Sequence, residues 1–218
     1  MTETTAMVVI DPERALADAT NRRQIVERMR SGNILRASVD YGVIPGSSKP
    51  SLLKPGAERL CSAFGLNPQF ELINSVERWE PDSPLFHYQY RCRLIHIESG
   101  LEFATGIGSC NSMEAQHRWR NAERTCPECG KTAIIKGKPE YGGGWLCFKK
   151  MGGCGAKFAI DDPAITEQVV GKIPNDDIFS LVNTIDKKAQ KRSLIAAVLI
   201  GANASEHFTQ DVEELPGF

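Results

Sequence analysis

The spacing of four cysteines constrains the fold of this chain more than any other sequence feature. Four of its seven cysteines form two pairs within a short segment that is rich in glycine. Such a segment is too small to fold around a hydrophobic core of its own, whereas four thiolates around one zinc ion stabilise folds of this size. The odd number of cysteines and the CPECG sequence favour metal binding over disulfides. We therefore predict a structural Zn2+ site in a zinc-ribbon-like module, formed by Cys126, Cys129, Cys147 and Cys154.

The sequence leaves two alternatives open for this module. The spacing between Cys147 and Cys154 is longer than in most zinc ribbons, so the second turn must be larger, and His117 is an alternative ligand. Its lysine and aromatic residues are the mixture that binds single-stranded nucleic acid, but the aromatic residues could equally form the small core of the module. These residues are Lys131, Lys136, Lys138, Lys149, Lys150 and Lys157, with Tyr141, Trp145, Phe148 and Phe158.

Residues 176–200 predict one long helix that has two different faces. Apolar residues recur at helical spacing and indicate a stripe that packs on a core, namely Ile178, Val182, Ile185, Ala189, Ala196 and Leu199. Basic residues project together along a flank beside this stripe, namely Lys187, Lys188, Lys191 and Arg192. The flank is either the solvated side of the helix or a site for an anion. Asn175 or Asp176 is the expected N-cap, and Gly201 with Asn203 is the expected stop.

Three segments of alternating polar and apolar residues, 69–79, 85–97 and 101–109, predict an antiparallel meander. In the middle strand, Arg91 and Arg93 lie on one face among polar neighbours. This face is either ordinary exposed surface or the floor of a groove, and the strand alone does not decide between them.

The chain before the meander is expected to contain two helices and a loop. Residues 12–37 predict either one helix with Asp11 as its N-cap or two helices divided at Gly32 and Asn33. Residues 57–64 predict a short helix after a loop rich in Gly and Pro. This loop and short helix carry local positive charge and form either a surface loop or a binding loop. The basic residues concerned are Lys49, Lys54 and Arg59.

The expected fold is α+β, with a three-stranded antiparallel meander packed on helices and an inserted zinc module. The expected divisions begin with an N-terminal helical region at 1–40, whose first ten residues are expected to be disordered. Residues 41–111 should contain the loop, the short helix and the meander, and residues 112–174 the zinc module and linker. The principal helix is expected at 175–204 and a mobile acidic tail at 205–218.

Composition limits the class of protein. With 41% hydrophobic and 24% charged residues the chain is typical of soluble globular proteins, and its net charge of −1 means that any nucleic-acid site must be a local patch. There is neither a secretory signal sequence nor an apolar run long enough to span a membrane, so we expect a cytoplasmic protein. A phosphate-binding loop, a compact carboxylate cluster and a Gly-x-Ser-x-Gly motif are all missing, which argues against an enzyme.

Several segments together resemble the single-strand annealing proteins of the Rad-fifty-two superfamily, which includes phage-type recombinases. KPGAERLCSAFGLNPQFELINSV resembles the turn, helix, Phe-Gly and first strand of that family, and ATGIGSC resembles the Gly-x-Gly of its third strand. KKAQKRSLIAAVLIGA resembles its Lys-Arg-Ala helix, and both YGVIPGSSKPSLLKPGAERL and the acidic FTQDVEEL have counterparts in phage-type members.

The resemblance implies a β-β-β-α annealing core that needs no ATP, forms a homo-oligomeric ring or filament, and binds single-stranded DNA in a basic groove during recombination or repair. Lys191 and Arg192 match the Lys-Arg pair that lines this groove, and Lys54 lies in the loop beside it. The setting would be a bacterial or phage-infected cell, with no membrane partner. The alternative function is a zinc-ribbon adaptor in nucleic-acid metabolism, whose acidic tail would contact a replication or recombination protein.

Overall fold

The computed structural model describes residues 11–43, 47 and 49–209, in two compact units. The first unit comprises residues 1–111 and 182–218, and the second comprises residues 112–181. The zinc module and linker expected at 112–174 begin at the same residue as the second unit, but the second unit extends further, to Leu181. The expected disorder of residues 1–10 and most of the expected acidic tail lie outside the described residues.

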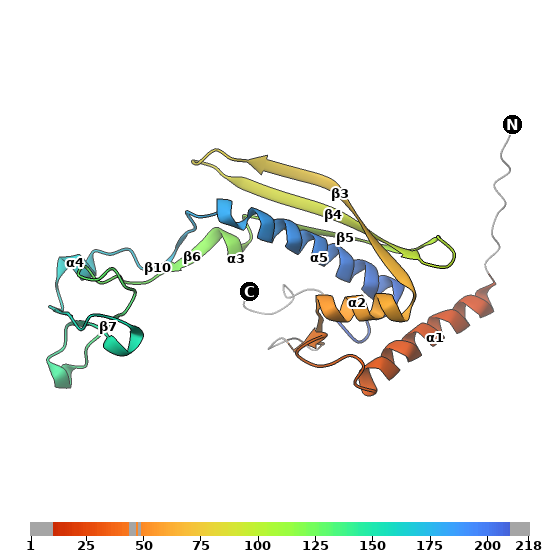
Figure 1. Cartoon of the computed structure of the whole chain (residues 1–218), viewed down its shortest axis with the longest axis horizontal. Coiled ribbons are helices and arrows are strands. Elements are labelled where there is room, and N and C mark those ends of the chain that lie inside the picture. Colours follow the sequence, from red (N-terminus) through yellow and green to blue (C-terminus); the bar gives the residue numbers. More distant parts are fainter. Residues whose placement is uncertain (1–10, 44–46, 48, 210–218) are drawn as a thin grey trace. The chain divides into compact units, whose positions relative to one another are not determined.

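Antiparallel sheets and helices build the first unit, so the predicted α+β class is confirmed (Figure 1). Its elements are α1 (Pro12–Ser31), β1 (Tyr41–Gly42), β2 (Ser51–Leu52), α2 (Lys54–Ala63), β3 (Leu66–Arg78), β4 (Leu85–His96), β5 (Glu102–Asn111) and α5 (Val182–Gly201). The order β3-β4-β5 is the predicted meander, and β1 pairs with β2. As predicted, Asp11 caps α1 by accepting from the backbone N–H of Glu13, and α1 ends at Ser31, where Gly32 and Asn33 form the predicted break, so the helix does not continue to residue 37.

A bulge in β3 changes which of its side chains share a face. Phe70 pairs with Cys92 and Leu72 pairs with Tyr90, but the register shifts between Leu72 and Asn74. After the bulge, Val76 lies on the face opposite to Phe70 and Leu72, although all three alternate regularly in the sequence.

Helix α5 lies along β4 and β5 and approaches β5 closely because two strand residues are glycines (Figure 1). A Cβ atom at Gly106 would overlap the backbone nitrogen of Ala197, and a Cβ atom at Gly108 would overlap that of Ser193. These glycines therefore let the helix backbone rest directly on the sheet.

Helix α5 is shorter and more deeply buried than the sequence predicts. It begins at Val182, and Asn175 instead accepts a hydrogen bond from the N–H of Asp177, so the predicted N-cap is wrong. The predicted stop at Asn203 is confirmed by its positive φ of 53°. Burial extends beyond the predicted stripe because the sheet covers one side of α5 and α2 packs on another. The buried residues include Ser193, Leu194, Ile195, Ala197 and Val198.

The segment after α5 folds back onto the first unit. Phe208 is buried, with its ring centroid 5.5 Å from that of Tyr41, and the N–H of Thr209 donates to Pro50. The prediction of a mobile tail starting at residue 205 is therefore wrong for residues 205–209, because Phe208 supplies apolar surface to the core.

The second unit is built from short elements. They are α3 (Ala115–Arg118), β6 (Trp119–Ala122), β7 (Ile134–Lys136), η1 (Pro139–Tyr141), β8 (Trp145–Cys147), η2 (Lys149–Met151), β9 (Lys157–Phe158), α4 (Pro163–Thr166), β10 (Gly171–Pro174) and η3 (Phe179–Leu181). The sheets are a two-stranded ladder of β6 and β10 and a three-stranded sheet of order β7-β8-β9. Among the described residues, no helix of either unit combines the length and the apolar character needed to cross a membrane.

The close approach of α5 to β5 predicts that Gly106→Ala lowers the free energy of unfolding by about 3 kcal/mol, because the added methyl group must push the helix away from the sheet. Gly42→Ala is the matched control, since its Cβ atom would meet only Leu53 at an ordinary 3.9 Å. Urea denaturation of both variants measures the difference. Equal stability of the two variants would contradict the packing.

Candidate metal centre and nucleic-acid interface

Two glycine-rich turns bring the four predicted metal ligands together. In the first turn the N–H of Gly130 donates to the backbone carbonyl of Cys126, and the N–H of Cys126 donates to the backbone carbonyl of Lys131. Gly130 has a φ of 69°. The second turn follows β8, which ends at Cys147, and continues through η2 to Cys154. The helical turn η2 occupies the long spacing between these two cysteines, which explains why this spacing exceeds that of most zinc ribbons.

The four sulfur atoms lie within 4.8 Å of one another, so the predicted cluster of four cysteines is confirmed. The Sγ atoms of Cys126 and Cys154 are 3.7 Å apart, as are those of Cys129 and Cys147. Tetrahedral coordination with metal–sulfur bonds of about 2.3 Å places sulfur atoms about 3.8 Å apart, so the cluster fits a four-coordinate metal ion. His117 lies outside this cluster, which removes it as the alternative ligand.

Backbone N–H groups around the cluster favour the thiolate form at Cys129, whereas burial and the neighbouring cysteines raise the pKa of Cys147 and of Cys154. The N–H of Lys131 lowers the pKa of Cys129 to about 7, and the N–H of Cys154 donates to the sulfur of Cys147 at 3.3 Å. The Lys131 ammonium group also donates to the carbonyl of Gly152 at 2.7 Å and so connects the two turns. These contacts position the sulfur atoms for binding.

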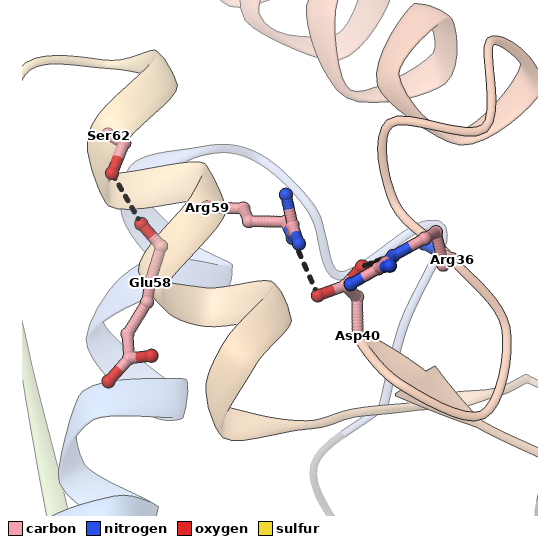
Figure 2. Close-up of polar contacts among 5 residues, drawn as sticks. All are labelled: Arg36, Asp40, Glu58, Arg59 and Ser62. Carbon is pink, nitrogen blue, oxygen red and sulfur yellow. Dashed lines mark hydrogen bonds and ion pairs between the residues drawn. The ribbon is translucent and has the colours of Figure 1, made fainter.

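The nine basic residues predicted to bind nucleic acid do not gather on one surface. Arg59 is held by Asp40, whose fully buried carboxylate accepts from the Arg59 guanidinium at 2.8 Å and from the backbone N–H of Arg36 at 2.9 Å (Figure 2). Burial alone would raise the pKa of Asp40, but these donors outweigh burial and hold the pKa below its usual value. Arg59 therefore ties α2 to the loop before β1.

Four other predicted cations also have partners. Lys54 lies 3.5 Å from Glu58 of the same helix, and Lys49 donates to the carbonyl of Ser205. Arg91 and Arg93 pair with acidic side chains of neighbouring strands, at 3.0 Å from Glu71 and 2.7 Å from Glu102 respectively. They also point away from α5, because Cys92 and Leu94, which alternate with them along β4, are buried on the helix side.

The basic flank of α5 divides into two pairs. Arg192 is half-buried and donates to the carbonyl of Ser109 at 2.6 Å, so it contributes to packing on the sheet rather than lying free on the flank; Lys188 is also half-buried. Lys187 and Lys191 are exposed, and within the described part of the chain neither has a polar partner. Of the four basic residues on this flank, these two keep an exposed positive charge that has no polar partner in the described part of the chain.

Sequence reasoning missed a set of exposed apolar side chains on the same face of the meander as α5. Phe70, Leu72 and Trp79 are 44%, 48% and 54% exposed. Leu72 pairs with Tyr90, whose hydroxyl donates to Asp186 of α5 at 2.6 Å, so this part of β3 faces the helix side. We call these three side chains with Lys187 and Lys191 the helix-side surface. Their alternation in the sequence predicted only a strand. It did not indicate that α5 would cover β4 and β5 and leave β3 exposed.

Comparisons with known proteins identify no relative of this chain. No protein-family model matches it, and neither a curated protein nor a solved structure does. The resemblance to single-strand annealing proteins therefore remains a prediction from the sequence.

We expect Cys126→Ser to release the bound metal and unfold the segment around the cluster, because three thiolates no longer close a tetrahedral site. Elemental analysis of the purified chain should give one metal ion for the parent and none for the variant. Cys61→Ala is the matched control, since Cys61 is buried in α2 and belongs to no cluster of possible ligands among the described residues. A Cys126→Ser protein that keeps its metal would contradict the four-thiolate site.

The buried carboxylate of Asp40 gives a pH-dependent prediction. Asp40→Asn should lower the free energy of unfolding at pH 7 by about 2 kcal/mol, since charge-assisted hydrogen bonds are lost. Because the folded-state pKa is depressed, the stabilisation is present above the unfolded pKa of about 4 and is lost as pH falls through the folded pKa. The difference between parent and variant should therefore shrink below about pH 4. Urea titrations across this range measure it, and a constant difference would contradict the assignment.

Proposed function

We propose that this protein binds and anneals single-stranded DNA without ATP, as a homo-oligomer acting in recombination or repair. The observation that carries the proposal is the pair of exposed, unpartnered lysines Lys187 and Lys191 on the side of the meander that also exposes Phe70, Leu72 and Trp79. Phosphate neutralisation combined with base stacking is how proteins bind single strands without sequence preference.

Annealing requires little chemistry beyond this binding. Lysine charges near the phosphates reduce the repulsion between two strands, and aromatic or aliphatic side chains hold the bases apart in an extended strand. Base pairing then supplies the free energy of the reaction. Because the whole chain has a net charge of only −1, the local surplus on α5 supplies the attraction.

The proposal assigns Zn2+ to the cluster of four cysteines. Four thiolates in a closed tetrahedral site are typical of structural zinc, which supports a fold and takes no part in a reaction. Self-association is supported by β3, which is a long strand at the edge of its sheet and can pair with a second chain.

The test is the annealing of two complementary fluorescent oligonucleotides without nucleotide. We expect the parent to accelerate annealing, and we expect Lys187→Ala with Lys191→Ala to weaken strand binding by about ten-fold or more, because two phosphate contacts are lost. This variant replaces the Lys191 and Arg192 pair that the sequence suggests, since removal of Arg192 would also disturb the packing of α5 on β5.

The matched control is Arg91→Ala with Arg93→Ala, which removes the same charge from the opposite face of the meander. It should anneal like the parent. Normal annealing by the lysine variant, or loss confined to the arginine variant, would place the strand elsewhere. A folded parent that does not accelerate annealing would overturn the proposed function.

A further inference from the structure

The segment 125–160, which we call the ribbon, holds a second surplus of positive charge. It contains six lysines and two glutamates, a surplus of four positive charges, which becomes two when four thiolates and a divalent ion are counted. All six lysines are exposed. In the described part of the chain no ion pair joins any of them to a carboxylate, whereas most predicted cations of the meander and α2 are paired.

Two of these lysines are accounted for by the metal centre. Lys131 donates to the carbonyl of Gly152, and the aliphatic part of Lys149 lies over Gly155, so both shape the second turn. Their charges also offset those of the thiolates. The structure gives no such role to the remaining four lysines, which are Lys136, Lys138, Lys150 and Lys157.

The ribbon also places a half-exposed aromatic side chain beside these charges. Lys136 pairs with Trp145 across β7 and β8, so both side chains lie on one face of the sheet. The guanidinium of Arg124 lies 4.4 Å from the ring centroid of Trp145, whose indole N–H donates to Ile160. These contacts fix the orientation of the ring next to the lysine, and a fixed ring loses little entropy when a base packs against it.

We infer that the ribbon is a second binding surface for single-stranded nucleic acid, with Lys136, Lys138, Lys150 and Lys157 contacting phosphates and Trp145 contacting a base. This inference rests on the proposed function, because it names the same class of ligand. A flexible polyanion suits lysines that lie on both faces and at both ends of a small sheet, since a single strand can follow a curved path around it.

The experiment measures binding of a fluorescein-labelled oligothymidylate to the full chain over a series of salt concentrations. The ribbon variant changes all four lysines to glutamine, and its matched control changes the same four to arginine. Each lost phosphate contact reduces the magnitude of the slope of log K against log salt by about 0.7, so the glutamine variant should lose about 3 from the slope and bind at least ten-fold more weakly. The arginine control should bind like the parent.

The smaller variant Lys136→Gln with Lys138→Gln guards against loss of the metal site, because Lys136 lies at the opposite end of the β7–β8 ladder from Cys147. It should keep its metal by elemental analysis and show about half the change in slope. Unchanged affinity and slope in both glutamine variants, with normal annealing, would overturn the inference and leave the proposed function standing. If the parent binds no oligothymidylate, the proposed function fails and the inference fails with it.

Discussion

The first unit depends on the close approach of α5 to β5. Gly106 and Gly108 leave no side chain between helix and strand, so the backbone of α5 lies directly on the sheet at Ala197 and Ser193. This contact fixes which side of α5 is buried and therefore which lysines remain exposed. It also centres the helix on β4 and β5, so that Phe70 and Leu72 of the edge strand β3 stay uncovered.

Charge compensation then separates structural cations from candidate binding cations. Arg59 forms an ion pair with the buried carboxylate of Asp40, and Arg91 and Arg93 form ion pairs with acidic residues of neighbouring strands. Because each of these arginines already has a carboxylate partner, it contributes little attraction for a further anion. Lys187, Lys191 and four ribbon lysines have no carboxylate partner among the described residues. Two separate regions of a nearly neutral chain thus keep uncompensated positive charge, one on each unit.

The sequence predicts the parts of this fold that depend on local patterns. Alternation predicts the three strands, and the spacing of the two cysteine pairs predicts the cluster that Cys126, Cys129, Cys147 and Cys154 form. The remaining features depend on contacts distant in sequence, which local patterns do not contain. The partner of Arg59 is one such feature, and the burial of Phe208 at the end of the chain is another. The bulge after Leu72 also could not be predicted, because regular alternation continues through it.

The proposed function requires that a single strand binds to the helix-side surface of the meander. Photochemical cross-linking of an oligothymidylate to the full chain, followed by identification of the cross-linked peptides, tests this claim most directly. We predict cross-links at Phe70 in β3 or at Trp79 directly after it, and in the N-terminal half of α5. Cross-links confined to the opposite face, around Arg91 and Arg93, would contradict it.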